Sequence, residues 1–391
     1  MRGLTLLLAL FLTACSVSPV ELTPTPAPTH EPGTTAVTVL LDLSGTRAPG
    51  GAAQRNAMQL WFDQDQTRGG AQRLRVKFVD LAGSEARLLI ELRRAAEEDR
   101  ADAVVIGVPF AYDETFARAL SVARLPVFLT LPAPDPASRP GGGWAFALAP
   151  THADLARAAV ADATGRGALQ PILLASDESP AAVAERLALA GELEQRGLVA
   201  PTVVAVSAQD PAARVRAGAA FARNAFFTGP AATYVEAARS LTAAGITPRI
   251  YLSYLMESTD AAALREGADL ATWPGSRNLA AVSAAPTTPE RAAFLQTYAA
   301  RYGPASTLAA TAYDALALID AAAAGVGGTP ERVRLRDRVE ATTFAGITTR
   351  YAFTAGRHAG FDTADLVYLR WSAGPRVGFA LAHEPAPKDE R

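Results

Sequence analysis

Short apolar runs alternate with stretches of helical periodicity along most of the chain. The first run, Val37–Gly45 (VTVLLDLSG), is rich in β-branched residues and stops at a turn, and helical spacing begins near Gly50. This pattern predicts a buried parallel strand, a turn and a covering helix. The same pattern recurs with strands expected at Leu74–Asp80, Ala103–Gly107 and Pro126–Leu131 and helices at Ser84–Asp99 and Tyr112–Ala123. We therefore expect right-handed βαβ units and a parallel sheet.

A stretch rich in proline and glycine, PAPDPASRPGGG, interrupts this alternation, which then restarts. The strands expected after the break are Trp144–Leu148, Leu169–Ala175, Thr202–Val206, Ala225–Thr228 and Arg249–Tyr254. The helices expected between them are Thr151–Ala163, Ala181–Arg196 and Ala231–Ala243. The sequence thus predicts a second α/β lobe of about the same size as the first.

The end of the chain changes from helical to β-rich. Helices are expected at Pro289–Tyr302, Thr307–Ala324 and Glu331–Thr342, and strands at Thr349–Phe353, Leu366–Trp371 and Arg376–Ala380. If the helices return to the first lobe and the strands to the second, the chain crosses between lobes three times, near 147–150, 273–276 and 346–348. Lobe 1 is then 36–148 with 276–346, lobe 2 is 149–275 with 347–382, and 383–391 is a tail.

The N-terminus carries the features of an export signal. Arg2 precedes a short apolar run that ends in Leu12-Thr13-Ala14-Cys15 and is too short to span a bilayer. This ending resembles the lipobox of bacterial lipoproteins, which implies removal of residues 1–14 and a lipid anchor on Cys15; the alternative is an ordinary cleaved signal with an incidental cysteine. Residues 15–35, rich in proline and threonine, are expected to form an extended tether.

Composition narrows the class of protein. The chain has 49% hydrophobic and 19% charged residues, as a globular protein does, and its net charge of -2 argues against nucleic acid as a partner. The roughly 355 residues after the tether are more than one ordinary core holds. Cys15 is the only cysteine, so no disulfide within the chain is expected. No stretch after Cys15 is expected to span a membrane.

The sequence lacks the motifs that would indicate an enzyme. It contains no Gly-x-Ser-x-Gly elbow, no phosphate-binding loop and no His-Glu-x-x-His pair, and its 4 histidines are scattered. We therefore expect no catalytic residues, no cofactor and no metal site. We also expect the protein to act as a monomer.

Several landmarks, in order, resemble the type I periplasmic ligand-binding proteins of branched-chain amino acid uptake systems. They are VTVLLDLSG, GSEARLLIELRRAAEEDRADAVVIG, ARLPVFLTLPAPDP, the paired helices around Tyr313-Asp314-Ala315, and FAGITTRYAFTAGR with DLVYLRW. The resemblance covers most of residues 36–372. It implies a two-lobed α/β fold in which each lobe is a parallel-sheet sandwich and a three-crossing hinge joins them.

The resemblance also implies a function. A protein of this family captures a small solute between hinged lobes and delivers it to the membrane permease of an ATP-driven (ABC) importer. Such a protein would be exported and held by its lipid anchor at the outer face of the cell membrane or in the periplasm. The open alternative is a lipoprotein of the same fold that binds and regulates an envelope protein.

Ligands of doubly wound sheets bind outside the carboxyl ends of the strands, so the turns that follow the strands are where we expect ligand-binding residues. In the first lobe the candidates are Ser44, Ala111, Tyr112 and Thr130. In the second lobe they are Thr228, Tyr254 and Glu257, the last at a place where the family often has an acidic residue for an ammonium group. A helix starting near Tyr112 could offer backbone N–H groups to an anion.

The family pattern is incomplete at several of these positions. Pro49-Gly50-Gly51 stands where the family commonly has an aromatic residue that packs on the ligand. Ala111 and Pro134 stand where a serine and a threonine commonly help to hold a carboxylate, and Thr130 is the nearest substitute. A branched-chain amino acid is therefore not assigned as the ligand.

Overall fold

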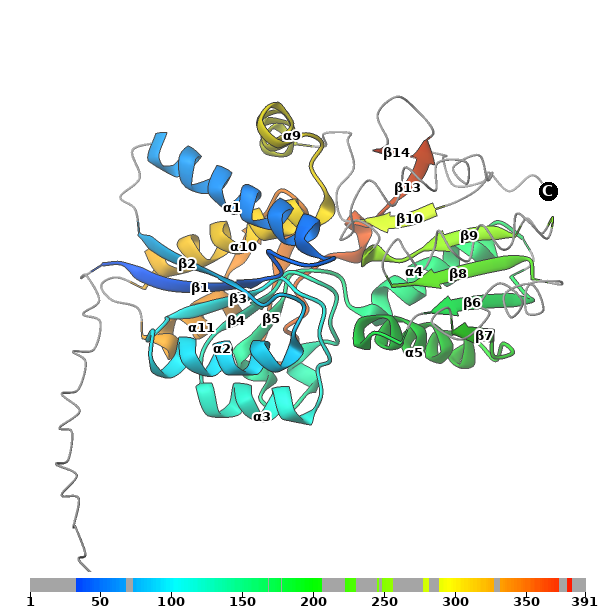
Figure 1. Cartoon of the computed structure of the whole chain (residues 1–391), viewed down its shortest axis with the longest axis horizontal. Helices are drawn as coiled ribbons and strands as arrows, with labels where there is room; N and C mark the ends of the chain where they lie inside the picture. The colour runs from blue at the N-terminus through cyan, green and yellow to red at the C-terminus, as the bar shows by residue number, and fades with distance from the viewer. Residues whose placement is uncertain are drawn as a thin grey trace, which may run out of the picture.

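The computed structural model has two α/β lobes side by side, each with its own sheet (Figure 1). The structure describes residues 33–67, 73–167, 169–176, 178–205, 222–229, 245, 248–255, 277–280, 288–326, 331–372 and 378–381. The expected signal peptide, Cys15, the helix at 231–243, the crossing at 273–276 and the tail lie outside these residues, as does all of the tether before residue 33.

The first sheet has five strands, all parallel, in the order β2-β1-β3-β4-β5. They are β1 (Thr35–Leu41), β2 (Leu74–Asp80), β3 (Ala103–Ile106), β4 (Val127–Leu129) and β5 (Ala145–Ala147). Because β1 is paired on both edges and covered on both faces, it is buried along its whole length, which explains its continuous apolar run.

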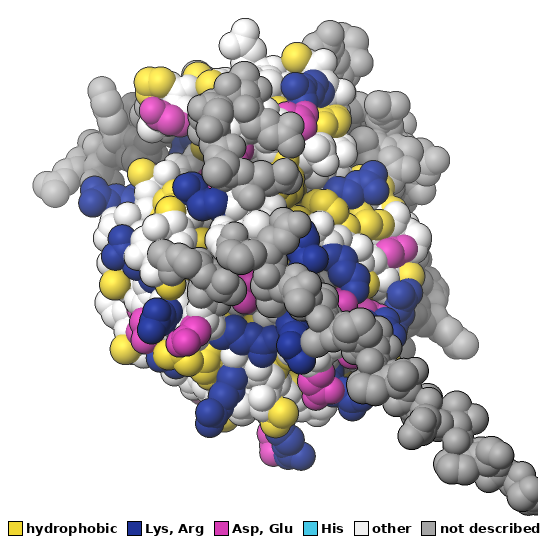
Figure 2. Space-filling view, turned by 90° about the vertical axis from the view of Figure 1, so that its left-hand side faces the viewer, with side chains coloured by type: hydrophobic (Ala, Val, Ile, Leu, Met, Phe, Trp, Pro, Cys, Tyr) yellow, Lys and Arg dark blue, Asp and Glu magenta, His cyan; other side chains and the backbone are white. Residues whose placement is uncertain are grey.

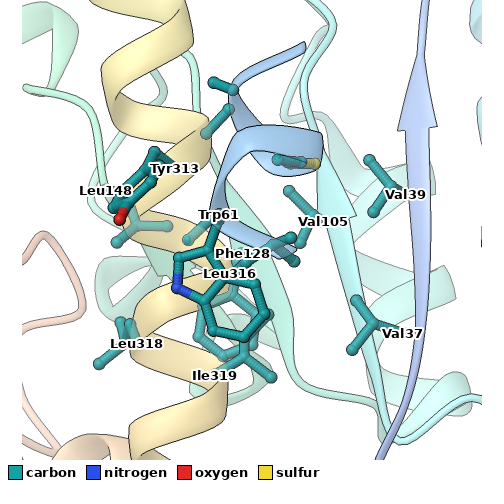
Figure 3. Packing of buried hydrophobic residues seen from close by; sticks show 14 of the residues in the cluster. Val37, Val39, Trp61, Val105, Phe128, Leu148, Tyr313, Leu316, Leu318 and Ile319 are labelled. Carbon is teal, nitrogen blue, oxygen red and sulfur yellow. The ribbon is translucent and has the colours of Figure 1, made fainter. Parts of the chain in front are cut away.

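Helices cover both faces of this sheet, α1 (Ala48–Thr67) and α10 (Thr307–Ala324) on one and α2 (Glu85–Glu97) and α3 (Glu114–Ala123) on the other (Figure 1). Side chains alternate between the faces along each strand. Val37 and Val39 pack in one cluster with Trp61 and Leu316 (Figure 3). Leu40 belongs to the cluster of α2 and α3. The first lobe is thus a three-layer sandwich.

Helix α10 is the most deeply buried helix of the first lobe. It is long and apolar enough to cross a membrane by length and composition, but 83% of it is buried inside the protein. A helix that is apolar all round is expected in the centre of a large core. Helices α9 (Pro289–Tyr302) and α11 (Arg332–Glu340) also contribute to this core.

The second sheet has seven strands in the order β14-β13-β10-β9-β8-β6-β7. They are β6 (Ile172–Ser176), β7 (Thr202–Ala205), β8 (Asn224–Thr228), β9 (Arg249–Leu252), β10 (Arg277–Ala280), β13 (Val367–Ser372) and β14 (Gly378–Leu381). Strands β6 to β10 are parallel, and β13 and β14 add to one edge antiparallel. Helices α4 (His152–Gly165) and α5 (Pro180–Gln195) pack on this sheet.

The structure differs from the expected elements in three places. Strands β10 and β11 (Thr343–Ala345) were not predicted, and α3 begins at Glu114 rather than Tyr112 because Asp113 caps it. Strand β11 pairs with β12 (Arg350–Ala352), and Tyr351 packs in the core of the first lobe. Ile347 and Phe353 pack in the same core, and the expected lobe boundary at residue 346 stays a prediction.

The crossing segments lie side by side. The N–H of Ala147 donates to the carbonyl of His358 (2.8 Å), and the N–H of Gly360 donates to the carbonyl of Ala147 (3.0 Å). The buried ring of His358 stacks on Phe146 with 4.5 Å between ring centroids. The end of β5, which leads to α4, is thus tied to the segment that leads back to β13.

Charged side chains of both signs are interspersed on the end of the first lobe (Figure 2). Ion pairs of this lobe include Lys77 with Asp99 (2.6 Å) and Arg73 with Asp320 (2.7 Å). Exposed pairs of this kind contribute about 1 kcal/mol or less each, so the stability of the lobe comes mainly from its core.

A buried carboxylate on α10 holds the turn that follows β11. Asp314 is 0% exposed and accepts hydrogen bonds from the N–H groups of Ile347 (2.7 Å) and Thr348 (2.9 Å). The hydroxyls of Thr348 and Tyr351 also donate to it. A Cβ at Gly346 would lie 2.6 Å from the Asp314 carboxylate, so only glycine fits there.

A buried arginine holds the same turn from the other side. The guanidinium of Arg291 donates to the carbonyls of Ile347 and Thr348. The N–H and carbonyl groups of Ile347 and Thr348 are therefore all hydrogen-bonded, by a carboxylate on α10 and a guanidinium on α9. Such paired satisfaction makes buried backbone outside a sheet tolerable.

Burial raises the pKa of Asp314 to about 6, although hydrogen bonds from Thr348, Ile347 and Tyr351 oppose the rise. An unfolded aspartate titrates near pH 4, so between these values the folded protein holds more protons and its stability falls as pH rises. We expect the free energy of unfolding of the wild type, relative to Asp314→Asn, to fall by about 2 kcal/mol from pH 4 to pH 7. Urea unfolding of both proteins at the two pH values measures this, and parallel pH profiles would contradict it.

Candidate functional site

A cavity of about 580 Å³ lies between the lobes. The first lobe lines it with the segments that follow β3 and β4, and the second lobe with the starts of α4 and α5. Among its lining residues are Phe110, Ala111, Tyr112, Arg139, His152 and Leu187. A volume of this size is typical of a small-molecule site.

Tyr112 is one of the polar side chains of the first-lobe wall. Its ring packs edge-on against Phe116 (centroids 5.0 Å apart) and near Phe110, and its hydroxyl is buried. Burial raises the pKa of Tyr112 well above its ordinary value, Asp135 adds to the rise, and Arg139 opposes it. The phenol is therefore neutral at all physiological pH values.

His152 is the corresponding side chain of the second-lobe wall. It is the first residue of α4 and is 7% exposed. Burial lowers the pKa of His152 to about 4, so its imidazole is neutral at pH 7. His152 also lines a second, inner cavity of about 60 Å³ between α4, α5 and the ends of β8 and β9.

The inner cavity contains two of the residues predicted from the sequence, Thr228 and Tyr254. Both are buried, at 6% and 3% exposure. Glu185 of α5 holds the strand ends beside them, because it accepts hydrogen bonds from the Ser253 hydroxyl (2.7 Å) and the Gly229 N–H (3.3 Å). The second-lobe wall is thus built on fixed strand ends.

Each helix that begins at the interlobe cavity has a capping residue whose side chain accepts a hydrogen bond from a backbone N–H of its first turn. Asp113 accepts from the N–H of Phe116 (2.9 Å) at the start of α3, and Thr151 forms a capping box with Asp154 at the start of α4. Ser179 caps α5. Asp113 thus satisfies one of the first N–H groups of α3, and the expected offer of the other N–H groups to an anion near Tyr112 stays a prediction.

Ser44 lies in the exposed turn after β1 and is not a residue of either cavity. Its side chain bonds to Asp80, whose carboxylate also accepts from the N–H of Leu43 (2.8 Å). Burial would raise the pKa of Asp80, but these hydrogen bonds and that from the Ala82 N–H outweigh it and lower the pKa. Ser44 thus stabilises its own turn in this structure.

Thr130 is fully buried in the first lobe rather than at the cavity. Its hydroxyl donates to the Gln54 side-chain oxygen (2.7 Å), and the Gln54 amide donates to the Gly107 carbonyl (2.7 Å). A Cβ at Gly107 would lie 2.2 Å from that glutamine. The threonine therefore supports the ends of β3 and β4 from inside.

The place of the missing aromatic residue is closed by the backbone. Gly51 lies in the first turn of α1, and a Cβ there would come within 1.8 Å of the Asp42 carbonyl oxygen. No side chain fits at this close approach of helix and strand.

Of the seven predicted residues, the structure brings Ala111 and Tyr112 to the interlobe cavity and Thr228 and Tyr254 to the inner one. Glu257 lies outside the described residues. Within the described part of the chain, no group of three or more His, Cys, Asp or Glu side chains is placed to hold a metal ion.

His152, which lines both cavities, was missed from the sequence. The only signal was its place just after the cap residue Thr151, at the start of the first helix after a crossing. A histidine there is hard to distinguish from a surface residue, because its burial depends on α5 and the strand ends of the second lobe.

Comparison with known proteins agrees with the two-lobed architecture. A family model described as periplasmic binding protein matches residues 34–375, whereas no curated protein sequence matches the chain. A leucine binding protein from Thermotoga maritima superposes with a TM-score of 0.72 at 16% identity, covering 88% of this chain and 97% of that one.

Two further solved structures carry bound ligands. A branched-chain amino acid transporter substrate binding protein from Streptococcus pneumoniae, in complex with isoleucine, gives a TM-score of 0.70 at 18% identity, with 89% and 99% of the two chains covered. A solute binding protein from R. palustris, in complex with benzoate, gives 0.69 at 16% identity, with 89% and 96% covered. Identities this low show a shared fold.

The Thr130 hydroxyl is expected to be structural. Thr130→Val keeps the shape but leaves the buried Gln54 oxygen without its donor, which should cost about 1–3 kcal/mol of unfolding free energy. Thr297→Val is the control, because its hydroxyl bonds to a carbonyl of its own helix at the surface. Urea unfolding checks both variants, and equal small losses would show that the Thr130 bond is unimportant.

Proposed function

The chain belongs to the periplasmic binding protein family, and we propose that it is the membrane-tethered solute-binding subunit of an ABC importer. It acts outside the cytoplasm, captures a small ligand between its lobes and presents the closed form to a permease. Members of this family are binding proteins rather than enzymes, and this protein shares that class.

The observation that carries the proposal is the cavity lined from both lobes. Tyr112 and Arg139 reach it from the first lobe, and His152 and Leu187 reach it from the second. A ligand that contacts both walls binds the closed arrangement better than the open one, and that difference in affinity is what shifts the population. A permease that recognises the closed form would then receive loaded protein.

The bound ligands of related structures support a small organic solute of this general size. Those structures are described with isoleucine and with benzoate, two molecules of different chemistry. The fold therefore accommodates different solutes through changes in the residues at its cleft.

The proposed location depends on Cys15 and the tether. A lipid anchor there, followed by residues 15–35, would hold the two lobes near the outer face of the cell membrane, where a permease is found. The proposed partners are therefore the solute, the permease subunits and the membrane, and the proposed state is a monomer.

Lipidation is expected to require Cys15. Cys15→Ser should abolish incorporation of labelled palmitate and move the protein from the detergent phase to the aqueous phase on Triton X-114 partition. Ser16→Ala is the matched control and should partition as the wild type does. Retention of the label in Cys15→Ser would refute the anchor.

Solute binding is expected to stabilise the protein. A ligand present at about 100 times its Kd adds about 2.7 kcal/mol to the unfolding free energy, which should raise the melting midpoint by about 2 °C or more. A thermal-shift screen of the full chain carrying Cys15→Ser, against amino acids, amides, amines and small carboxylates, measures this. Failure of every solute would count against solute capture and favour a protein partner.

A further inference from the structure

Three exposed arginines lie on the edge of the first sheet where the chain enters the lobe. Arg75 is the second residue of β2, Arg100 comes three residues before β3, and Arg124 comes three residues before β4. Because these strands and β1 are parallel neighbours in one sheet, their starts share one edge. The described chain begins at Gly33, two residues before β1, so the proposed tether joins the lobe at this same edge.

Anions near this edge are engaged by other groups. Asp99 pairs with Lys77 (2.6 Å) and Asp320 pairs with Arg73 (2.7 Å), while the buried Asp102 accepts from a backbone N–H of β1. Further acidic residues nearby are also paired, Glu97 with Arg93, Glu98 with Arg94 and Glu331 with Arg334. The three arginines, in contrast, form no ion pair and no side-chain hydrogen bond with another described residue.

The helix ends beside these arginines are held by a different cation. The guanidinium of Arg332 donates to the carbonyls of Ala96 (2.8 Å), Ala101 (2.9 Å) and Ala123 (3.3 Å), which lie at or just beyond the ends of α2 and α3. A cation at a helix C-terminus is favourable, and here this one guanidinium serves both helices. The exposed arginines that follow α2 and α3 are therefore not required to hold the helix ends.

The backbone at two of the three positions favours glycine. Arg100 has a φ of 50° and Arg124 a φ of 44°, both in the left-handed region. Glycine adopts this region without the steric cost that a Cβ brings. Within the described part of the chain, Ala82 is the other non-glycine residue with a positive φ. Arginine at two such positions on one edge indicates a role for the side chain rather than for the backbone.

We propose that Arg75, Arg100 and Arg124 form an arginine face that binds the anionic lipid surface of the membrane in which Cys15 is anchored. The inference rests on the proposed function, since it takes the anchor from it. The chain as a whole has a net charge of -2, so attraction to an anionic surface has to come from a local cluster. Figure 2 faces this end of the lobe and shows Lys and Arg side chains spread over it.

The tether supports a membrane as the partner of the arginine face. Residues 15–33 reach at most about 65 Å when fully extended, so an anchored lobe stays close to the bilayer. Because the chain enters the lobe at the arginine face, this face can approach the bilayer without the lobe turning over. The interlobe cavity lies beyond the opposite edge of the sheet and would then face away from the bilayer, where solute arrives.

Binding to vesicles tests the charge of the face. The full chain carrying Cys15→Ser is sedimented with vesicles of phosphatidylcholine alone and with vesicles that contain about one third phosphatidylglycerol. Every protein tested carries residues 1–14, so the ratio of anionic to neutral affinity cancels their apolar contribution. An arginine near an anionic surface adds about 5-fold to the affinity, so the triple variant Arg75→Gln, Arg100→Gly and Arg124→Gly should lower the ratio about 10-fold or more. The wild-type ratio should fall steeply at about 0.5 M salt.

A matched triple variant removes the same charge from other faces. It carries Arg55→Gln, Arg87→Gln and Arg139→Gln, three exposed arginines that lie in α1, in the first turn of α2 and at the interlobe cavity. This control should keep the wild-type ratio. Equal ratios in the wild type and the arginine-face variant, or an equal loss in the control, overturn the inference.

Thermal unfolding separates a surface role from a structural one. Glycine relieves the backbone at both left-handed positions, so Arg100→Gly and Arg124→Gly should each leave the melting midpoint unchanged or raised. A lowered midpoint together with an unchanged vesicle ratio would mean that these arginines serve the fold, and would overturn their assignment to the membrane.

The anchor and the arginine face can fail separately. If palmitate labelling requires Cys15 but the vesicle ratio does not depend on the three arginines, the anchor stands and the face is wrong. If Cys15→Ser keeps the label, the proposed anchor fails, and the vesicle ratio still decides whether the face binds anionic lipid.

Discussion

The fully buried carboxylate of Asp314 accepts hydrogen bonds from two backbone N–H groups and two hydroxyls, while the guanidinium of Arg291 donates to the carbonyls of the same two residues, Ile347 and Thr348. This arrangement fixes the irregular turn at 346–348 inside the first lobe. The chain that follows this turn pairs with the end of β5 and then adds β13 to the second sheet beside β10. A polar network of this kind is costly unless every member is satisfied, and here the turn is satisfied from both sides.

The segment that pairs with the end of β5 lies a few residues from the interlobe cavity. Residues 358–360 pair with Ala147, and the chain then runs from Ala147 through three residues to Thr151 and His152. The wall of the cavity in the second lobe thus begins a few residues beyond the crossing. A change in the angle between the lobes would therefore move His152 relative to Tyr112.

Much of the fold could be predicted from the sequence, because long periodic helices and continuous apolar strands are dictated locally. Helices α9 and α10 have the predicted bounds, whereas β10 and β11 are short strands whose pairing depends on distant partners. The site residues were harder to predict from the sequence than the fold was. Thr130 and Ser44 have the right residue type and place, but their hydroxyls are engaged by Gln54, 76 residues away, and by Asp80. No local pattern reveals such long-range partners, or the burial of His152.

The departures from the family pattern support one consistent interpretation when they are taken together. The resemblance predicts hydroxyls for a carboxylate and an aromatic residue after the first strand. Here Ala111 has no hydroxyl, the Thr130 hydroxyl is used inside the lobe, and the Asp42 carbonyl closes the space beside Gly51. The groups that the resemblance assigns to a carboxylate and to an aromatic contact are thus absent or used to hold the first lobe together, so the resemblance does not identify the ligand.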